Sequence, residues 1–179
     1  MILKDQELYF VFINPAKPRK SYDGKKYQWE FQVRTKDKAV RKQWLDMGLE
    51  AKSVKTVRAD KTDDESPVLY YATTFRKSAE PRERGGKTVQ SMPIQVVDGK
   101  QREMDASIGN GTIANILLYE REYEIGGVKK KGFTPTKIQV RKLHEYKGGE
   151  MEDFDDEEFE TEIIEDEAEG GSTDDKDMY

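Results

Sequence analysis

The chain has 179 residues, of which 35% are hydrophobic and 37% charged, and its formal net charge is -5. Cysteine is absent, which excludes disulfides, thiolate catalysis and cysteine zinc sites. Residues 1–10 lack the basic and apolar segments of a secretion signal, and no stretch approaches the roughly 18 apolar residues of a membrane span. We therefore expect no membrane partner and a cytoplasmic location, in the host cell cytoplasm if the chain is viral.

The charge is divided unevenly along the chain. Residues 150–179 hold 16 of the 36 Asp and Glu but only one of the 31 Lys and Arg, which leaves 30 basic and 20 acidic side chains in residues 1–149. A body near +10 therefore carries a tail near -15. Because the tail has too few apolar side chains to offset its ordering entropy, we predict one folded domain over 1–149 and a disordered acidic tail over 150–179.

The first half of the chain predicts strands around one helix. Leu8 to Ile13 is an apolar run typical of a buried strand, and a basic loop follows from Ala16 to Lys26. Tyr27 to Thr35 alternates strictly and is the clearest strand in the sequence. Val40, Trp44 and Met47 recur at helical spacing, so we expect a short helix there, with Thr35 as its cap and Gly48 as its stop.

The second half is also rich in strand patterns. Lys52 to Arg58 alternates weakly, an acidic loop follows, and Val68 to Lys77 is rich in β-branched and aromatic residues before a basic loop. Pro93 to Val97 predicts a strand paired as a hairpin with Lys100 to Met104. Long strands are expected over Thr112 to Ile125 and over Thr136 to Leu143. The body is therefore predicted to be mainly β with one helix.

Candidate catalytic residues are few. The only histidine is His144, and no Ser, His and Asp constellation can be built around it. Asp60, Asp63, Asp64 and Glu65 are close in sequence but lie in a segment without an apolar pattern to hold a magnesium site. We predict no enzyme, no metal and no cofactor, with a metal-dependent nuclease as the weakest alternative.

Basic residues flank aromatic strands in several places, as single-stranded nucleic acid requires, because cations bind phosphates and exposed rings stack on unpaired bases. The expected phosphate contacts are Arg19, Lys20, Lys25, Lys26, Arg76, Lys77, Arg82, Arg84, Lys87 and Arg121. The expected stacking rings are Tyr22, Trp29, Tyr71, Phe75 and Tyr119. These fifteen residues form the predicted DNA-binding set.

Some of these rings have a competing structural role. An alternating strand buries one face, so a core position is favoured for Phe31, while core and stacking roles stay open for Tyr27 and Trp29. Tyr119 and Arg121 share a face of their strand with Tyr123. A charged residue on that face favours contact with solvent or ligand.

These features together resemble the single-stranded DNA-binding proteins of tailed bacteriophages. The resemblance rests on Ile108-Gly109-Asn110-Gly111 before a long strand, on Lys131-Gly132-Phe133-Thr134-Pro135 leading into Ile138-Gln139-Val140, and on an acidic tail ending in an aromatic residue. It implies a five-stranded OB-fold barrel with a packed helix, binding single-stranded DNA with little sequence preference. It also implies roles in phage DNA replication, recombination and repair.

The tail has two expected roles. By charge, it competes with DNA for the basic cleft. By resemblance, it recruits replication proteins such as DNA polymerase or helicase-primase through Met178 and Tyr179, although the family tail usually ends in phenylalanine. The alternative function is an acidic-tailed scaffold or chaperone that binds basic proteins. RNA as the ligand and a homodimer both stay open at this point.

Overall fold

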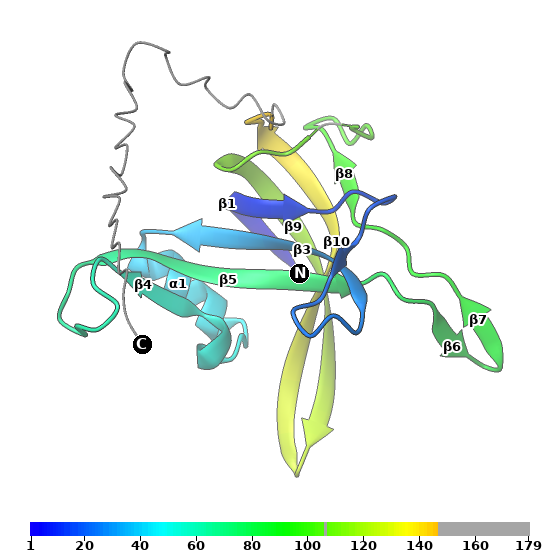
Figure 1. Ribbon diagram of the computed structural model, residues 1–179, viewed down its shortest axis with the longest axis horizontal. Coiled ribbons are helices and arrows are strands. Elements are labelled where there is room, and N and C mark those ends of the chain that lie inside the picture. Colours follow the sequence, from blue (N-terminus) through cyan, green and yellow to red (C-terminus); the bar gives the residue numbers. More distant parts are fainter. Residues whose placement is uncertain (106, 147–179) are drawn as a thin grey trace, which may run out of the picture. The chain divides into compact units, whose positions relative to one another are not determined.

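The structure is a computed structural model that describes residues 1–105 and 107–146, and most of these residues lie in β-strands (Figure 1). The elements in chain order are β1 (Ile2–Phe12), β2 (Arg19–Lys20), β3 (Tyr27–Thr35), α1 (Lys38–Asp46), the 3-10 turn η1 (Ala51–Ser53), β4 (Lys55–Arg58), β5 (Val68–Ser78), β6 (Arg82–Arg84), β7 (Lys87–Val89), β8 (Gln95–Val97), β9 (Thr112–Ile125) and β10 (Val128–Lys142). The predicted strands at 27–35 and 112–125 are confirmed at both ends.

The five long strands are arranged as in an OB-fold. They lie in the order β5-β3-β1-β9-β10, with β4 and β8 added at the two edges and β2 paired to β3. Neighbouring long strands are antiparallel throughout, whereas β8 runs parallel to β10. In Figure 1, β1, β3 and β5 run across the view and β9 and β10 run down it. The predicted fold class, a mainly β OB-fold with one short helix, is confirmed.

The core lies on the inner faces of these strands. Trp29, Phe31 and Val33 alternate inward from β3, and Phe75 meets Phe31 at 5.8 Å between ring centroids. Leu8 and Ile116 add fully buried side chains from β1 and β9. Side chains of this size each contribute about 1.5 to 3 kcal/mol on burial. The strict alternation read from the sequence of 27–35 is therefore the inner and outer face of a central strand.

Two bulges interrupt β1, and side chains from one other segment stabilise both. The pairing register shifts where Asp5 and Phe10 adopt positive φ angles of 51° and 49°. The backbone N–H of Asp5 donates to Asn115 Oδ1 at 2.9 Å, and that of Phe10 donates to Asn110 Oδ1 at 2.8 Å. Because a bulge reverses the alternation of side chains, Phe10 is 50% exposed and Phe12 39% exposed. The prediction of a buried strand over 8–13 is wrong at these two positions.

Helix α1 packs through one tryptophan. The side chain of Asp37, not that of Thr35, caps its first turn by accepting from the backbone N–H of Ala39 at 2.7 Å. Gly48 follows the helix with φ of 110°, as the sequence predicted. Trp44 is fully buried, and its indole Nε1 donates to Gln6 Oε1 of β1 at 3.0 Å. The helix is thereby fixed to the sheet by both packing and a buried hydrogen bond.

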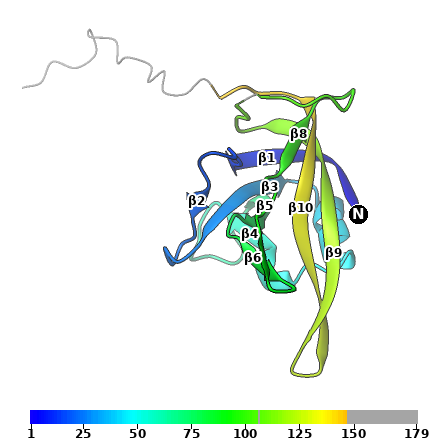
Figure 2. The same cartoon turned by 90° about the vertical axis from the view of Figure 1, so that its right-hand side faces the viewer.

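One hairpin lies within the main sheet and another forms a separate two-stranded sheet. Strands β9 and β10 form a long hairpin whose tip projects beyond the other strands in both views (Figures 1 and 2). Strand β10 begins at Val128, well before the start predicted at Thr136, so Lys129, Lys130 and Lys131 lie in the strand. Strands β6 and β7 form a short exposed hairpin where the sequence predicted a loop.

The hairpin predicted after β7 forms only in part: the backbone N–H of Met104 donates to the Val96 carbonyl, and that of Asp98 donates to the Arg102 carbonyl. Strand β8 pairs in parallel with β10, and only a single bridge joins Val97 to Glu103. The predicted domain boundary and acidic tail lie outside the described residues. Over the part of the chain that is described, no helix is both long enough and apolar enough to cross a membrane.

Candidate nucleic-acid interface

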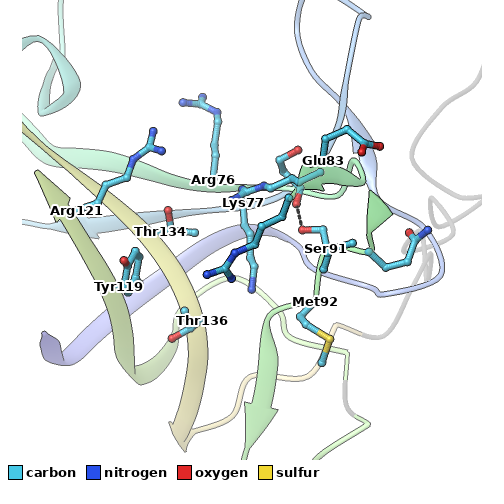
Figure 3. A pocket seen from close by; sticks show the side chains of 14 residues that line it. Arg76, Lys77, Glu83, Ser91, Met92, Tyr119, Arg121, Thr134 and Thr136 are labelled. Carbon is cyan, nitrogen blue, oxygen red and sulfur yellow. Dashed lines mark hydrogen bonds between the residues drawn. The ribbon is translucent and has the colours of Figure 1, made fainter. Parts of the chain in front are cut away.

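A groove of about 780 Å³ lies where β5 approaches β9 and β10 (Figure 3). Arg76 and Lys77 come from β5, Tyr119 and Arg121 from β9, and Thr134 and Thr136 from β10. The β6–β7 hairpin and the segment after it close the groove with Arg82, Glu83, Arg84, Val89, Gln90, Ser91 and Met92. No ladder joins β5 to β10, so the barrel is open at this seam.

The cations of this groove have few internal partners. Among residues 1–105 and 107–146, Lys77, Arg82, Arg84 and Arg121 make no ion pair. By contrast, Lys131 on the neighbouring hairpin pairs with Glu120 at 2.7 Å. Four cations around one groove, none of them in an ion pair with a described residue, produce a positive potential that favours an anionic ligand.

Lys77 shows the effect of this environment. Partial burial lowers the pKa of Lys77, and the nearby charge of Arg82 lowers it further. Both causes disfavour the ammonium form, because burial removes water and the arginine adds a like charge. A phosphate in the groove would stabilise the ammonium form and so offset the effects of burial and of Arg82 on the pKa of Lys77. In Figure 3, Arg76 and Lys77 leave β5 in opposite directions, so the strand presents a cation on each face.

A second groove of about 660 Å³ adjoins the first and shares Arg76 with it. Strand β2 contributes Arg19 and Lys20 to its lining, and the turn after β2 contributes Tyr22. At its base, the Glu30 carboxylate accepts from Arg19 Nη1 at 3.1 Å and from Arg76 Nε at 3.0 Å. Glu30 therefore aligns two arginines from different elements along one continuous basic surface.

The structure brings nine of the fifteen predicted residues to these two grooves. They are Arg19, Lys20, Tyr22, Arg76, Lys77, Arg82, Arg84, Tyr119 and Arg121. Lys25, Lys26 and Lys87 are exposed nearby in the chain but do not line either groove. The face shared by Tyr119 and Arg121 is open, since the Tyr119 ring is 62% exposed.

Three predicted stacking rings require correction. Trp29, Tyr71 and Phe75 are only 4%, 6% and 2% exposed. The indole of Trp29 donates to the Asn14 carbonyl at 3.0 Å, and Phe75 packs on Phe31. Their ring faces are covered by the core, so a base has no access to them. Of the two positions left open by the sequence, Trp29 is in the core, while Tyr27 is 45% exposed.

Sequence reasoning missed a group of aromatic rings that lie against arginines on the outer face of β1, β3 and β5. Arg34 lies within 4.3 Å of the Tyr9 and Tyr70 ring centroids and 4.9 Å of that of Phe10. Arg19 lies over Phe12 at 4.5 Å. The alternation of Tyr27 to Thr35 places Arg34 on the polar face of its strand, so its position on the outer face could have been predicted from the sequence. The exposure of Phe10 and Phe12 depends on the bulge, which the sequence does not reveal.

Comparison with solved structures shows which fold this is. The C-terminally truncated single-stranded DNA-binding protein of bacteriophage Enc34 matches with a TM-score of 0.50 and 12% identity, over 80% of this chain and 86% of that one. The chain has a phage single-stranded DNA-binding protein fold. The Enc34 protein in complex with single-stranded DNA matches at 0.49 and 11%, with the same coverage.

Another similar solved structure is that of gp2.5, a single-stranded DNA-binding protein encoded by bacteriophage T7. It matches with a TM-score of 0.49 and 15% identity, over 86% of this chain and 96% of that one. No family model and no curated protein matches the sequence. At such low identity, the likeness establishes the fold alone.

The motifs that carried the resemblance have structural roles in this phage fold. A side chain on Gly109 would lie 2.7 Å from the His144 carbonyl, and Asn110 holds the bulge at Phe10. A side chain on Gly132 would meet Arg121 and Tyr123 at 3.3 Å. Within the described ranges, no three His, Asp or Glu side chains gather as a metal site would require.

Proposed function

We propose that this protein binds single-stranded DNA with little sequence preference and without catalysing a reaction. The observation that carries the proposal is the groove between β5 and the β9–β10 hairpin, where Lys77, Arg82, Arg84 and Arg121 surround one exposed ring, Tyr119. Cations neutralise the backbone, and the ring accepts an unpaired base. The likeness to phage proteins whose names state that they bind single-stranded DNA supports this ligand.

The path of the strand follows from the two adjoining grooves. Phosphates pass from Arg121 and Lys77 to Arg76, and then to Arg19 and Lys20 of β2. Tyr22 lines the second groove on this path. Lys25 and Lys26, between β2 and β3, and Lys87, in β7, lie outside both grooves and add contacts to longer strands. In an OB-fold, the corresponding ligand surface is the face of the second and third strands with the adjoining loops.

The acidic tail gives this binding a means of regulation. Residues 150–179 carry a charge near -15 opposite to that of the body, so we propose that they compete with DNA for the grooves. When DNA displaces the tail, Met178 and Tyr179 become available to replication proteins. We place the protein in phage DNA replication or recombination, with the domain boundary near residue 149.

The test is a titration of the full chain with labelled oligothymidylate, matched RNA and duplex DNA at two salt concentrations. Fluorescence anisotropy is the suitable signal, because both tryptophans, Trp29 and Trp44, are buried and respond poorly to a surface ligand. We expect the affinity for single-stranded DNA to exceed the affinity for duplex DNA, and both affinities to fall as the salt concentration rises. Equal affinity for duplex, or no salt dependence, would contradict the proposal.

Deletion of residues 150–179 tests the tail separately. We expect the affinity for oligothymidylate to rise at low salt and the gain to shrink near 0.15 M, where the Debye length falls to about 8 Å. A weaker affinity after deletion would show that the tail assists binding instead of opposing it.

A further inference from the structure

The outer face of β1 presents two phenylalanine rings to solvent in a protein whose other phenylalanines on the strands are largely covered. Phe10 is 50% and Phe12 39% exposed, whereas Phe31 and Phe75 are in the core. Exposed apolar rings cost hydration free energy unless a ligand covers them. The exposure of Phe10 and Phe12 therefore indicates a surface that a ligand can cover.

The backbone at Phe10 is held in an uncommon conformation that creates this exposure. Its φ of 49° lies in the left-handed region, which is unfavourable for a bulky residue. The Asn110 side chain accepts the Phe10 backbone N–H at 2.8 Å and so stabilises the bulge. Strained positions of this kind concentrate at binding sites, and here the strain places a ring outward that regular alternation would bury.

Arginines lie against both rings. Arg34 approaches Phe10 at 4.9 Å, and Arg19 lies over Phe12 at 4.5 Å. The Arg19 side chain is itself 53% exposed, so the outer side of its guanidinium is available. Bases stack on both aromatic rings and guanidinium planes. We call Phe10, Phe12, Arg19 and Arg34 the β1 ledge.

The ledge is continuous with the basic grooves. Arg19 belongs to the ledge and also lines the groove that shares Arg76 with the main groove. In the sheet, Phe12 lies opposite Glu30, the residue that holds both Arg19 and Arg76. A strand whose phosphates follow these arginines would therefore have its bases beside Phe12 and Phe10.

We propose that the β1 ledge is a stacking surface for unpaired bases of the same nucleic-acid strand whose phosphates lie in the basic grooves. This inference rests on the proposed function and assigns it a base-contact surface that Trp29, Tyr71 and Phe75 cannot provide. Charge complementarity and continuity with the grooves select a nucleic acid as the occupant. A second protein or a second copy of this chain is the competing occupant.

The experiment compares oligothymidylate with an abasic deoxyribose-phosphate oligomer of equal length, using the full chain. The double variant Phe10→Ala with Phe12→Ala should bind oligothymidylate at least about fivefold more weakly for each ring removed. Its affinity for the abasic oligomer and its salt slope should stay at wild-type values, because no cation is lost. Phe10→Tyr with Phe12→Tyr keeps two rings and should retain wild-type affinity.

Controls separate the ledge from the proposed function. Leu69→Ala removes an apolar side chain that is 47% exposed on β5 and should leave both affinities unchanged. If wild-type protein binds neither oligomer, the proposed function itself fails. If wild-type protein binds both and the double alanine variant matches it, only the ledge is refuted. A lower mass of the alanine variant in sedimentation, with unchanged DNA affinity, would instead assign the ledge to contact between copies.

Discussion

Arg76 and Glu30 offer a test in which two substitutions break the same ion pair but change the charge of the groove in opposite directions. Arg76 Nε lies 3.0 Å from Glu30 Oε2, and the two side chains are 58% and 14% exposed. A pair this exposed contributes about 0 to 1 kcal/mol to stability. Arg76→Gln removes a cation from both grooves, whereas Glu30→Gln frees Arg19 and Arg76 from their shared carboxylate.

The magnitude follows from counterion release. Loss of one phosphate contact lowers the salt slope of single-strand binding by about 0.7, so the affinity deficit of Arg76→Gln should shrink about 2.6-fold between 50 and 200 mM salt. Glu30→Gln should bind more tightly than wild type at 50 mM salt, with a steeper slope. Fluorescence anisotropy with labelled oligothymidylate at four salt concentrations measures both. If both variants shift the affinity in the same direction, the loss of the Arg76–Glu30 ion pair changes the structure of the groove, and the electrostatic reasoning is refuted.

Further predictions concern the fold and its pH dependence. Trp29→Ala should lower the free energy of unfolding by about 3 to 5 kcal/mol in chemical denaturation, whereas Tyr22→Ala, at a fully exposed ring, should change it little; equal effects would contradict the core assignment. Trp44→Phe leaves buried Gln6 Oε1 without its donor at a cost of about 1 to 3 kcal/mol, and unchanged stability would refute that hydrogen bond. Hydrogen bonds from Lys52 and then Lys130 lower the pKa of Glu50 from 4.5 to about 2. Because the pKa of Glu50 is lower in the folded protein than in the unfolded chain, its carboxylate stabilises the fold at pH values above 4.5. The difference in unfolding free energy between wild type and Glu50→Gln should therefore be full above pH 4.5 and disappear as the pH falls towards 2. A difference independent of pH would contradict this reasoning.

Local sequence patterns predicted the strands well because every second side chain of a strand points into the core, which leaves an alternation of apolar and polar residues. Tyr27 to Thr35 could be read directly, since its inward residues are apolar and its outward residues are polar. The cap of α1 was assigned two residues early, because Thr35 and Asp37 are both good caps and only the backbone path selects between them. The pairing of β8 with β10 was missed because a parallel contact between distant segments leaves no turn signal.

The candidate site was predictable in its charges and less so in its rings. Basic residues are seldom buried, so Arg76, Lys77, Arg82, Arg84 and Arg121 could be assigned to the surface from their chemistry alone. An aromatic residue suits either a core or a binding surface, and Trp29, Tyr71 and Phe75 proved to be core. Phe10 is exposed only because Asn110, 100 positions away, stabilises a bulge in β1. Such long-range causes cannot be read from local spacing.

The most direct test of the account is to map where an unpaired strand contacts the protein. Amide chemical shifts of the isotope-labelled full chain, recorded during titration with a short oligothymidylate, would locate the contact residue by residue. The account predicts the largest changes at Arg76, Lys77, Tyr119 and Arg121, with little change in α1. Changes centred on α1 and β4, with the groove between β5 and the β9–β10 hairpin unaffected, would contradict it.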